Sequence, residues 1–313
     1  MKPIFLKPVL KHNIWGGTKL RDEFHYEVEG DDIGECWGIA AHTNGDCEVI
    51  FEGYEGDTLS SLWKNHPELF GKTKEETQKV VFPLLIKIID AKDDLSIQVH
   101  PDDAYAMKYE NGSLGKTECW YILGCEEDAT LVIGHNAKTR EELAQMIEAG
   151  AWSDLISEIH VKKGDFIQID PGMVHAIKGG ITLLETQQNS DITYRVYDYD
   201  RLSNGQPREL HIEKSIDVIT VPSMKEEGVI DTTNTPYNKL NKLYACEYYQ
   251  VFELKVKESF AFEKEASYML MSVVDGSGMI DGIAIKKGDH FILPLGMADT
   301  MLTGDMTIIA STE

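Results

Sequence analysis

The chain has 313 residues, 42% hydrophobic and 27% charged, which is the balance of a globular protein with room for a sizeable core. Its formal charge of −23 argues against nucleic acid or an anionic membrane as the main partner, because such surfaces repel an acidic protein. The longest apolar run, residues 80–89, is too short to span a bilayer and includes Lys87.

The five cysteines are odd in number and contain no C-x-x-C pair, and the N-terminal segment interrupts its apolar residues with prolines and lysines. The cysteine pattern is typical of a reducing compartment, and the N-terminal segment is unlike a signal peptide. We therefore expect a cytoplasmic protein that is not a membrane protein.

Short apolar segments separated by turns rich in glycine, asparagine and aspartate fill most of the chain, and this pattern predicts β-strands. The predicted strands span residues 4–6, 36–41, 47–51, 84–89, 95–99, 119–123, 129–133, 166–169, 181–185, 192–197, 249–256, 268–274, 291–293 and 306–311.

Three segments have helical spacing instead. They are residues 65–80, residues 139–159 and residues 208–221. The second of them begins with a capping box from Thr139 to Glu142. Residues 222–240, rich in proline, lysine, glutamate and threonine, are predicted to be a linker.

An internal repeat is visible in the sequence. The two copies are KKGDFIQIDPGMVH at residues 162–175 and KKGDHFILPLGMAD at residues 286–299. Aligning the glycines upstream of each copy places Glu118 opposite Leu270, and His175 falls opposite Asp299. Two related β units, of which the second has lost these polar residues, predict one functional site and one structural copy.

The segment LSIQVHP, residues 95–101, places Gln98 and His100 on one face of a strand and the apolar Ile97 and Val99 on the other. The polar pair therefore faces a groove, a barrel interior or water.

Two further polar residues complete a candidate metal site. Glu118 stands before the next strand, and His175 follows a proline–glycine turn. This spacing is a sequence signature of the cupin barrel, in which ligands from different strands converge on the interior. Two imidazoles, a carboxylate and an amide oxygen suit zinc, and manganese, iron or cobalt also fit. The alternative is a polar cluster whose members satisfy one another by hydrogen bonds.

The motifs together resemble those of the type I phosphomannose isomerase family. They are Q-V-H-P (98–101), K-T-E (116–118), P-G-M-V-H-A (171–176) and E-T-Q-Q-N-S-D-I-T-Y-R (185–195), with N-I-W-G-G (13–17), G-E-C-W-G (34–38) and P-L-L-I-K (83–87) as more distant matches. The chain is similar to the compact bacterial branch of that family.

The resemblance implies a metal-dependent interconversion of mannose 6-phosphate and fructose 6-phosphate with one bound Zn²⁺. It implies a mainly β fold of two tandem cupin-type (jelly-roll) β-barrels, with a few helices inserted or packed outside. We expect a catalytic cupin domain at residues 1–221, which contains the three helical segments, and a second, metal-free cupin domain at residues 241–313.

The resemblance also assigns site residues by motif. The zinc ligands are matched by Gln98, His100, Glu118 and His175, the active-site arginine by Arg195, and other pocket positions by Lys116, Asp191, Lys87, Glu185 and Trp15.

Aldose–ketose isomerisation moves a proton between C2 and C1 while charge builds on an oxygen of an enediol-like intermediate. The forked guanidinium of Arg195 suits a phosphate or an enediolate oxygen. Asp191 lies on the same face of the predicted strand and is a candidate base. A surface salt bridge between these two residues is the alternative.

Two interpretations remain open for each of the other pocket residues. Lys116 either reaches a sugar hydroxyl or phosphate, or lies solvated in a loop. Glu185 is a base or a partner of a ligand histidine. Lys87, in an apolar strand, is either paired inside or extends its amine to the edge. Trp15 stacks on a sugar or plugs the barrel mouth. The remaining histidines, His42 among them, have no matching motif.

Other classes of protein compete with the isomerase. An oxygenase would hold iron through a histidine-rich set, which Gln98 argues against. A sugar-binding protein without catalysis would not need the lysines and Arg195, which this chain retains. We expect a small phosphorylated sugar as partner and a monomer or weak homo-oligomer.

Overall fold

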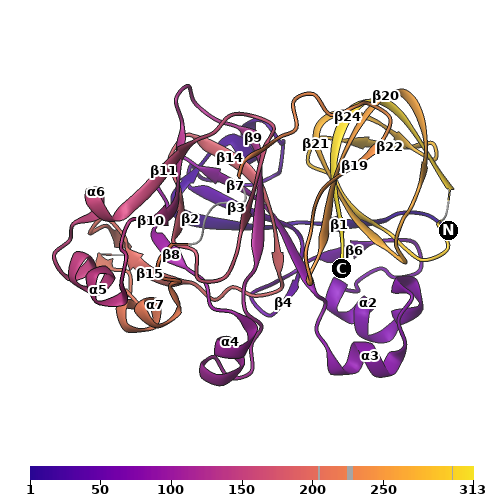
Figure 1. The fold of residues 1–313 in the computed structure, drawn as a ribbon. Coiled ribbons are helices and arrows are strands. Elements are labelled where there is room, and N and C mark those ends of the chain that lie inside the picture. Colours follow the sequence, from indigo (N-terminus) through magenta and orange to yellow (C-terminus); the bar gives the residue numbers. More distant parts are fainter. Residues whose placement is uncertain (204, 224–227, 298) are drawn as a thin grey trace.

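The computed structural model describes residues 1–203, 205–223, 228–297 and 299–313. The chain is mainly β, as predicted, and its strands form two lobes with helices at their outer edges (Figure 1). Residues 224–227 of the predicted linker lie outside the described residues. Within the described ranges, no helix combines the length and the apolar character that a membrane span requires.

Two sheets face each other in the first lobe. The larger one runs in the order β18 (Ile230–Asp231), β12 (Asp165–Ile169), β9 (Glu118–Gly124), β14 (Ile181–Gln188), β7 (Leu84–Ala91), β2 (Val9–Gly17) and β3 (Ile33–Ile39). The smaller one runs in the order β11 (Ile156–His160), β10 (Thr130–His135), β13 (His175–Ile177), β8 (Ile97–Val99) and β15 (Tyr194–Tyr197).

Alternation along β7 shows why the larger sheet has an apolar back and a partly polar front. Ile86 and Ile88 belong to the core behind it, which is shared with the second lobe. Lys87 and Ile89 point the other way, because successive side chains of a strand face opposite sides. Ile89 packs in the core between the two sheets of the first lobe, so Lys87 faces the same interior.

Helices cover the outer face of the smaller sheet. Leu143 and Ile147 of α5 pack against Val132 and Ala176 of the sheet. The helices on this face are α5 (Arg140–Glu148), α6 (Trp152–Leu155) and α7 (Ile212–Val218). The prediction of one helix over residues 139–159 was wrong at its end, because residues 156–160 form β11 and pair with β10.

The predicted helical segment 65–80 is split into shorter pieces. Its helices pack beneath the second lobe, where Trp63 and Phe70 contact Tyr268. The pieces are α2 (Leu59–Asn65), the 3-10 helix η1 (Pro67–Phe70) and α3 (Lys74–Lys79); α1 (Lys19–Asp22) and α4 (Asp103–Tyr109) are the other helices of the first 110 residues.

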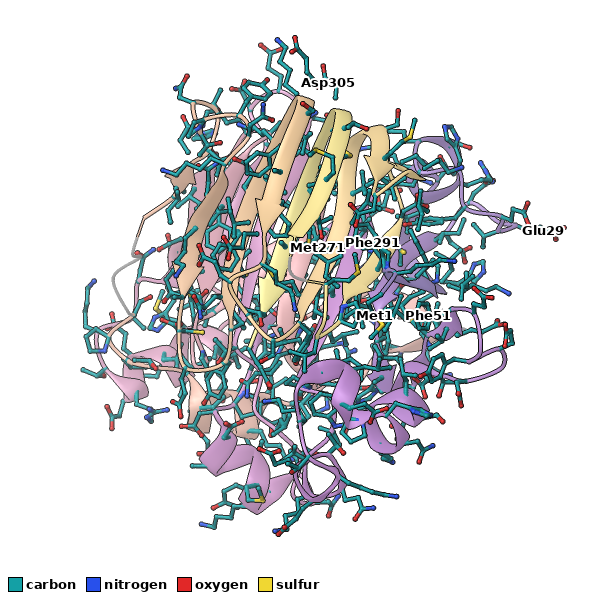
Figure 2. The ribbon with its side chains drawn as sticks, turned by 90° about the vertical axis from the view of Figure 1, so that its right-hand side faces the viewer. Met1, Glu29, Phe51, Met271, Phe291 and Asp305 are labelled. Atoms are coloured by element: carbon teal, nitrogen blue, oxygen red, sulfur yellow. The ribbon has the colours of Figure 1, made fainter. Side chains whose placement is uncertain are left out.

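One large sheet forms the second lobe, and one face of it encloses a core that includes Met271 and Phe291 (Figure 2). Its order is β19 (Leu240–Ala245), β20 (Gln250–Glu263), β24 (Asp299–Thr312), β21 (Met269–Ile280), β23 (His290–Leu293), β1 (Ile4–Lys7) and β6 (Glu48–Ile50), with β22 (Ile283–Lys286) paired to β21. Two strands of the N-terminal fifty residues thus complete the C-terminal sheet.

Two small hairpins stand apart from these sheets. They are β4 (Ala41–His42) with β5 (Gly45–Asp46), and β16 (Leu202–Ser203) with β17 (Gln206–Pro207).

The repeat is also a repeat in structure. The glycine of each K-K-G-D segment has a positive φ, +89° at Gly164 and +94° at Gly288. In both turns the aspartate carboxylate accepts a hydrogen bond from the backbone N–H of the first lysine. Strand register pairs Glu118 with Ile169, and the matching pair in the second copy is Met269 with Leu293. The counterpart of Glu118 is therefore Met269 and not Leu270.

Candidate metal centre and active site

Three ionisable side chains meet between the two sheets of the first lobe. Their ligand atoms all lie within 4.8 Å of one another, and all three residues are buried: His100, Glu118 and His175. The two Nε2 atoms of the histidines are 3.1 Å apart. The oxygens of Glu118 lie 3.5 Å from each ring.

Backbone carbonyls fix the orientation of both imidazoles. The Nδ1 of His100 donates to the carbonyl of Ile192 at 2.8 Å, and that of His175 donates to the carbonyl of Met173 at 2.9 Å. Each neutral ring therefore presents the lone pair of its Nε2 to the cluster. Burial lowers the pKa of His100 well below its usual value and that of His175 to about 4, so both rings are in the neutral form that binds metals.

Gln98 lies on β8 between His175 and Arg195, its partners on the two neighbouring strands. Its Nε2 is 3.2 Å from the Nε2 of His175. Rotating the amide by half a turn would present Oε1 at the same place, since the two ends of a carboxamide have similar shapes.

These residues fit a divalent metal. A tetrahedral site with bonds of about 2.0–2.1 Å separates its ligand atoms by about 3.3–3.4 Å, and the separations here are 3.1–3.5 Å. Glu118 is fully buried; its Oε2 is paired with Lys116, but its Oε1 has no hydrogen-bond partner among the described residues and lies 3.5 Å from Nε2 of His175. A buried carboxylate oxygen without a donor is costly, and a metal ion held between Glu118 and the two histidines would satisfy it.

A chain of buried charges adjoins the cluster. The Nζ of Lys116 is 2.7 Å from Oε2 of Glu118 and 3.8 Å from Oε1 of Glu185. The Nζ of Lys87 lies 3.4 Å from the same oxygen of Glu185 and 3.6 Å from Glu35. Lys87 is thus paired inside the lobe, which excludes the interpretation in which its amine extends to the edge.

The same charges shift the pKa values of the carboxyl groups in opposite directions. Burial, and then the neighbouring Glu185, raise the pKa of Glu118. Burial also acts to raise the pKa of Glu185, but the ammonium groups of Lys116 and Lys87 outweigh it and lower the value. For Lys87 the pKa is raised, because Glu35 and Glu185 outweigh the effect of burial. Glu185 and Lys87 are therefore both ionised.

A cavity of about 230 Å³ opens beside this chain of charges. Seven of the residues predicted from the sequence line it: Trp15, Lys87, Gln98, Lys116, Glu185, Asp191 and Arg195. Four lining residues that sequence reasoning missed are Asn13, Glu35, Trp37 and Arg208. The predicted ligands His100, Glu118 and His175 lie buried behind its wall, so the structure brings the whole predicted set together around one cavity.

Two guanidinium groups line this cavity. Arg208 is held by two hydrogen bonds to Asp198, at 2.7 and 2.6 Å. The buried Nε of Arg195 has no hydrogen-bond partner among the described residues. Burial, and then the charge of Arg208, lower the pKa of Arg195. Two adjacent cations, one with an unused donor, suit an anionic group. Arg208 follows a short hairpin outside the recognised motifs, which is why the sequence did not reveal it.

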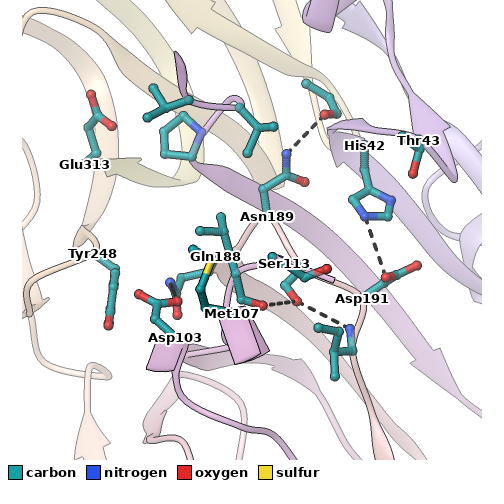
Figure 3. A pocket seen from close by; sticks show the side chains of 18 of the residues that line it. His42, Thr43, Asp103, Met107, Ser113, Gln188, Asn189, Asp191, Tyr248 and Glu313 are labelled. Atoms are coloured by element: carbon teal, nitrogen blue, oxygen red, sulfur yellow. Dashed lines mark hydrogen bonds and ion pairs between the residues drawn. The ribbon is translucent and has the colours of Figure 1, made fainter. Parts of the chain in front are cut away.

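Asp191 does not pair with Arg195, although they were expected to share a face. Its carboxylate accepts a hydrogen bond from Nδ2 of Asn44, and its Oδ1 lies 3.6 Å from Nε2 of His42. Figure 3 shows the contact with His42.

A larger and mainly apolar cavity of about 650 Å³ also has Asp191 in its lining (Figure 3). Its lining includes Val80, Val81 and Met107 but none of the metal-ligand residues. We place the candidate active site in the smaller cavity, because convergent polar groups are a better indicator of a reaction site than volume.

The comparisons with known proteins agree with this arrangement. Residues 4–123 match the family description "Phosphomannose isomerase type I, catalytic domain", and residues 239–313 match "Mannose-6-phosphate isomerase, cupin domain". A β fold with a cupin domain and a buried histidine–glutamate cluster defines a cupin protein with a candidate metal centre.

Individual relatives identify the family. The chain is 48% identical to mannose-6-phosphate isomerase ManA of Bacillus subtilis, over 99% of this chain and 98% of the relative. It is 44% identical to a mannose-6-phosphate isomerase of Streptococcus mutans over the same shares. The crystal structure of the Bacillus subtilis mannose 6-phosphate isomerase superposes with a TM-score of 0.90 at 43% identity, covering all of both chains. The chain belongs to the type I phosphomannose isomerase family.

Proposed function

We propose that this protein interconverts mannose 6-phosphate and fructose 6-phosphate. The observation that carries the proposal is the single cavity in which a candidate metal centre, a buried lysine–glutamate network and two guanidinium groups converge. The relatives in Bacillus subtilis and Streptococcus mutans are named for this activity.

The metal we propose is Zn²⁺, bound by Gln98, His100, Glu118 and His175. The support is the donor set of two imidazoles, a carboxylate and an amide oxygen, which is borderline between hard and soft. Such an ion acts as a Lewis acid that polarises carbonyl and hydroxyl oxygens and orients the sugar.

Arg195 and Arg208 are proposed to hold the phosphate. The reaction needs the open-chain sugar fixed in one orientation, and two guanidinium groups give a phosphate several parallel hydrogen bonds. With the phosphate held there, the sugar carbons extend along the cavity towards Lys116 and Glu185. Trp15, buried in the wall, would then pack on the sugar.

The proton transfer between C2 and C1 is proposed to use Lys116, Glu185 and Asp191. Lys116 is the cation closest to the cluster and is placed to donate to an oxygen that develops charge. Glu185 is held ionised by its two lysine partners. Asp191 lines the cavity and, among the described residues, has no lysine or arginine within ion-pair distance, so no cation of the chain competes with a substrate hydroxyl for its carboxylate.

The second unit is proposed to be structural. Residues 241–313 carry Met269 where the first copy has Glu118, and an apolar core fills that lobe. We keep residues 1–221 as the catalytic unit and 222–240 as the connection, although β1 and β6 pair within the sheet of the second lobe. The cytoplasm remains the proposed location, supported by five cysteines that form no disulfide.

A coupled assay tests the proposal. Purified protein is given mannose 6-phosphate as isolated, after chelation and after Zn²⁺ is added back, with glucose 6-phosphate as the control substrate. We expect turnover of mannose 6-phosphate that chelation abolishes and zinc restores. A folded, fully metallated protein without turnover would overturn the isomerase proposal, and turnover restored only by another divalent metal would overturn zinc.

A further inference from the structure

We infer that His42 is a positioning residue that fixes the carboxylate of Asp191 at the boundary of the active-site cavity. The inference rests on the proposed isomerase function and extends it to a residue outside the cavity lining. The two side chains come from segments almost 150 residues apart, and His42 approaches Asp191 from the side of the larger cavity (Figure 3).

The hydrogen bonds of His42 determine which of its nitrogens carries the proton. The backbone N–H of Asn44 donates to Nδ1 of His42 at 3.1 Å, so Nδ1 is an acceptor. The proton of the neutral ring is therefore on Nε2. That atom faces the carboxylate of Asp191 and lies 3.6 Å from its Oδ1 (Figure 3).

The other oxygen of the carboxylate has its own donor. Nδ2 of Asn44 donates to Oδ2 of Asp191, and the Nζ of Lys11 donates to the carbonyl oxygen of Asn44. His42 and Asn44, on either side of Thr43, thus supply a contact to each oxygen. A carboxylate contacted at both oxygens cannot rotate without losing both contacts.

His42 is itself held firmly. It ends β4 in a two-residue hairpin, in which His42 pairs with Gly45. The edge of its ring contacts Trp37 at a centroid distance of 5.8 Å. Trp37 also lies against Gly45, where a Cβ would come within 2.7 Å of the indole. Asn189 donates to the carbonyl of Ala41 at 3.1 Å and ties the hairpin to the larger sheet.

The position of Asp191 makes such support necessary. Its side chain is 37% exposed and precedes β15, so the sheet does not fix its rotamer. Arg195 lines the same cavity with an unpartnered Nε and would attract a carboxylate that was able to turn. An Asp191–Arg195 ion pair would neutralise the proposed base and occupy the proposed phosphate ligand. His42 and Asn44 hold the carboxylate away from that pairing.

A pair of matched substitutions tests the inference. Gln places its amide nitrogen near the position of Nε2, whereas Asn reaches only the position of Nδ1. We expect His42→Asn to lower kcat by about tenfold, because a displaced catalytic group loses its alignment with the substrate. KM should rise as well, because the released carboxylate of Asp191 can pair with Arg195, the proposed phosphate ligand. Metal content and melting temperature should stay close to the wild-type values. His42→Gln should restore most of kcat.

A double-mutant cycle separates positioning from a general structural role. If His42 acts through Asp191, then adding His42→Asn to Asp191→Asn should lower kcat no further. The inference would be overturned if the two substitutions lowered kcat multiplicatively, if His42→Asn kept the wild-type kcat, or if His42→Gln and His42→Asn lowered kcat equally. In each of these cases an active wild-type enzyme would still uphold the proposed function. An inactive wild-type enzyme would overturn both.

Discussion

The two copies of the repeat share a backbone but not an interior. Both begin with the same glycine turn, and both continue with a strand that pairs with its neighbour in the same register. The first copy directs Glu118 inward to meet two histidines, whereas the second directs Met269 into an apolar core. The scaffold therefore does not make a site by itself, and a few inward-facing residues decide whether a lobe binds a metal or only supports its neighbour.

Substituting Glu118 of the first copy is expected to give the largest effect on metal content and turnover, with a substitution of Met269 in the second copy as its control. Glu118→Gln keeps the shape and removes the charge, so we expect bound metal and turnover to fall by at least about 100-fold. A bound metal contributes several kcal/mol to such reactions, and 1.36 kcal/mol is a factor of ten. Elemental analysis and the coupled assay measure both quantities.

The matched control is Met269→Ala. It should lower the free energy of unfolding by about 2–5 kcal/mol, the usual cost of removing a buried methionine side chain. Metal content and turnover per folded molecule should not change. If Glu118→Gln kept its metal, or if Met269→Ala lost it, the contrast between the copies would be wrong.

Removing one of the buried charges of the first lobe should give the second-largest effect, a loss of stability. Lys87→Met leaves Glu35 and Glu185 without their shared cation, and we expect the free energy of unfolding to fall by about 3–5 kcal/mol. Urea titration measures this loss. Lys79→Met, which breaks an exposed pair with Glu75, is the control and should change stability little. Equal effects of the two substitutions would show that Lys87 is not confined as the structure indicates.

A buried histidine of the second lobe should give the third-largest effect, a dependence of stability on pH. His290 is buried between Ser272 and Tyr26, and burial lowers its pKa from 6.5 to about 4. The unfolded chain therefore binds a proton that the folded chain excludes, so the stability that His290 contributes is complete above pH 6.5 and is lost as the pH falls towards 4. Between pH 7 and pH 5 we expect a loss of about 2 kcal/mol from this group.

The measurement compares denaturant unfolding of the wild type and His290→Gln at both pH values. Glutamine does not titrate, so the variant should lose less stability on acidification than the wild type. The same loss in both proteins would assign the acid sensitivity to other groups.

The shared turn gives the smallest effect. Alanine at Gly164 or Gly288 must adopt a positive φ, which costs about 1–2 kcal/mol. The loss should be greater at Gly288, because a Cβ there would lie 3.1 Å from the carbonyl oxygen of Phe24, whereas the nearest atom at Gly164 is at 3.4 Å. Thermal unfolding ranks the two variants, and the reverse order would mean that the two turns differ in ways their backbones do not show.

The sequence pointed to the candidate metal cluster because its members carry local signals. Gln98 and His100 stand out by strand alternation, and Glu118 and His175 by their motifs. The structure brings His100, Glu118 and His175 within ligand distance of one another. The roles of the individual residues stay predictions.

Arg208 and His42 could not be predicted, because they reach the site from hairpins whose placement depends on tertiary packing. The split of segment 65–80 has a local cause, since Pro67 and Gly71 interrupt its helical spacing. The pairing of β1 with β23 had no local signal, because a strand of four residues does not specify its partner.

That pairing has a consequence for how the protein is made. Ile4 and Phe5 find their partners at Ile292 and Phe291, close to the opposite end of the chain. During synthesis one edge of the first strand stays unpaired until almost the whole polypeptide has left the ribosome. Contacts of such long sequence separation slow folding, and an uncovered edge invites aggregation. The final steps of translation therefore complete the first strand as well as the last.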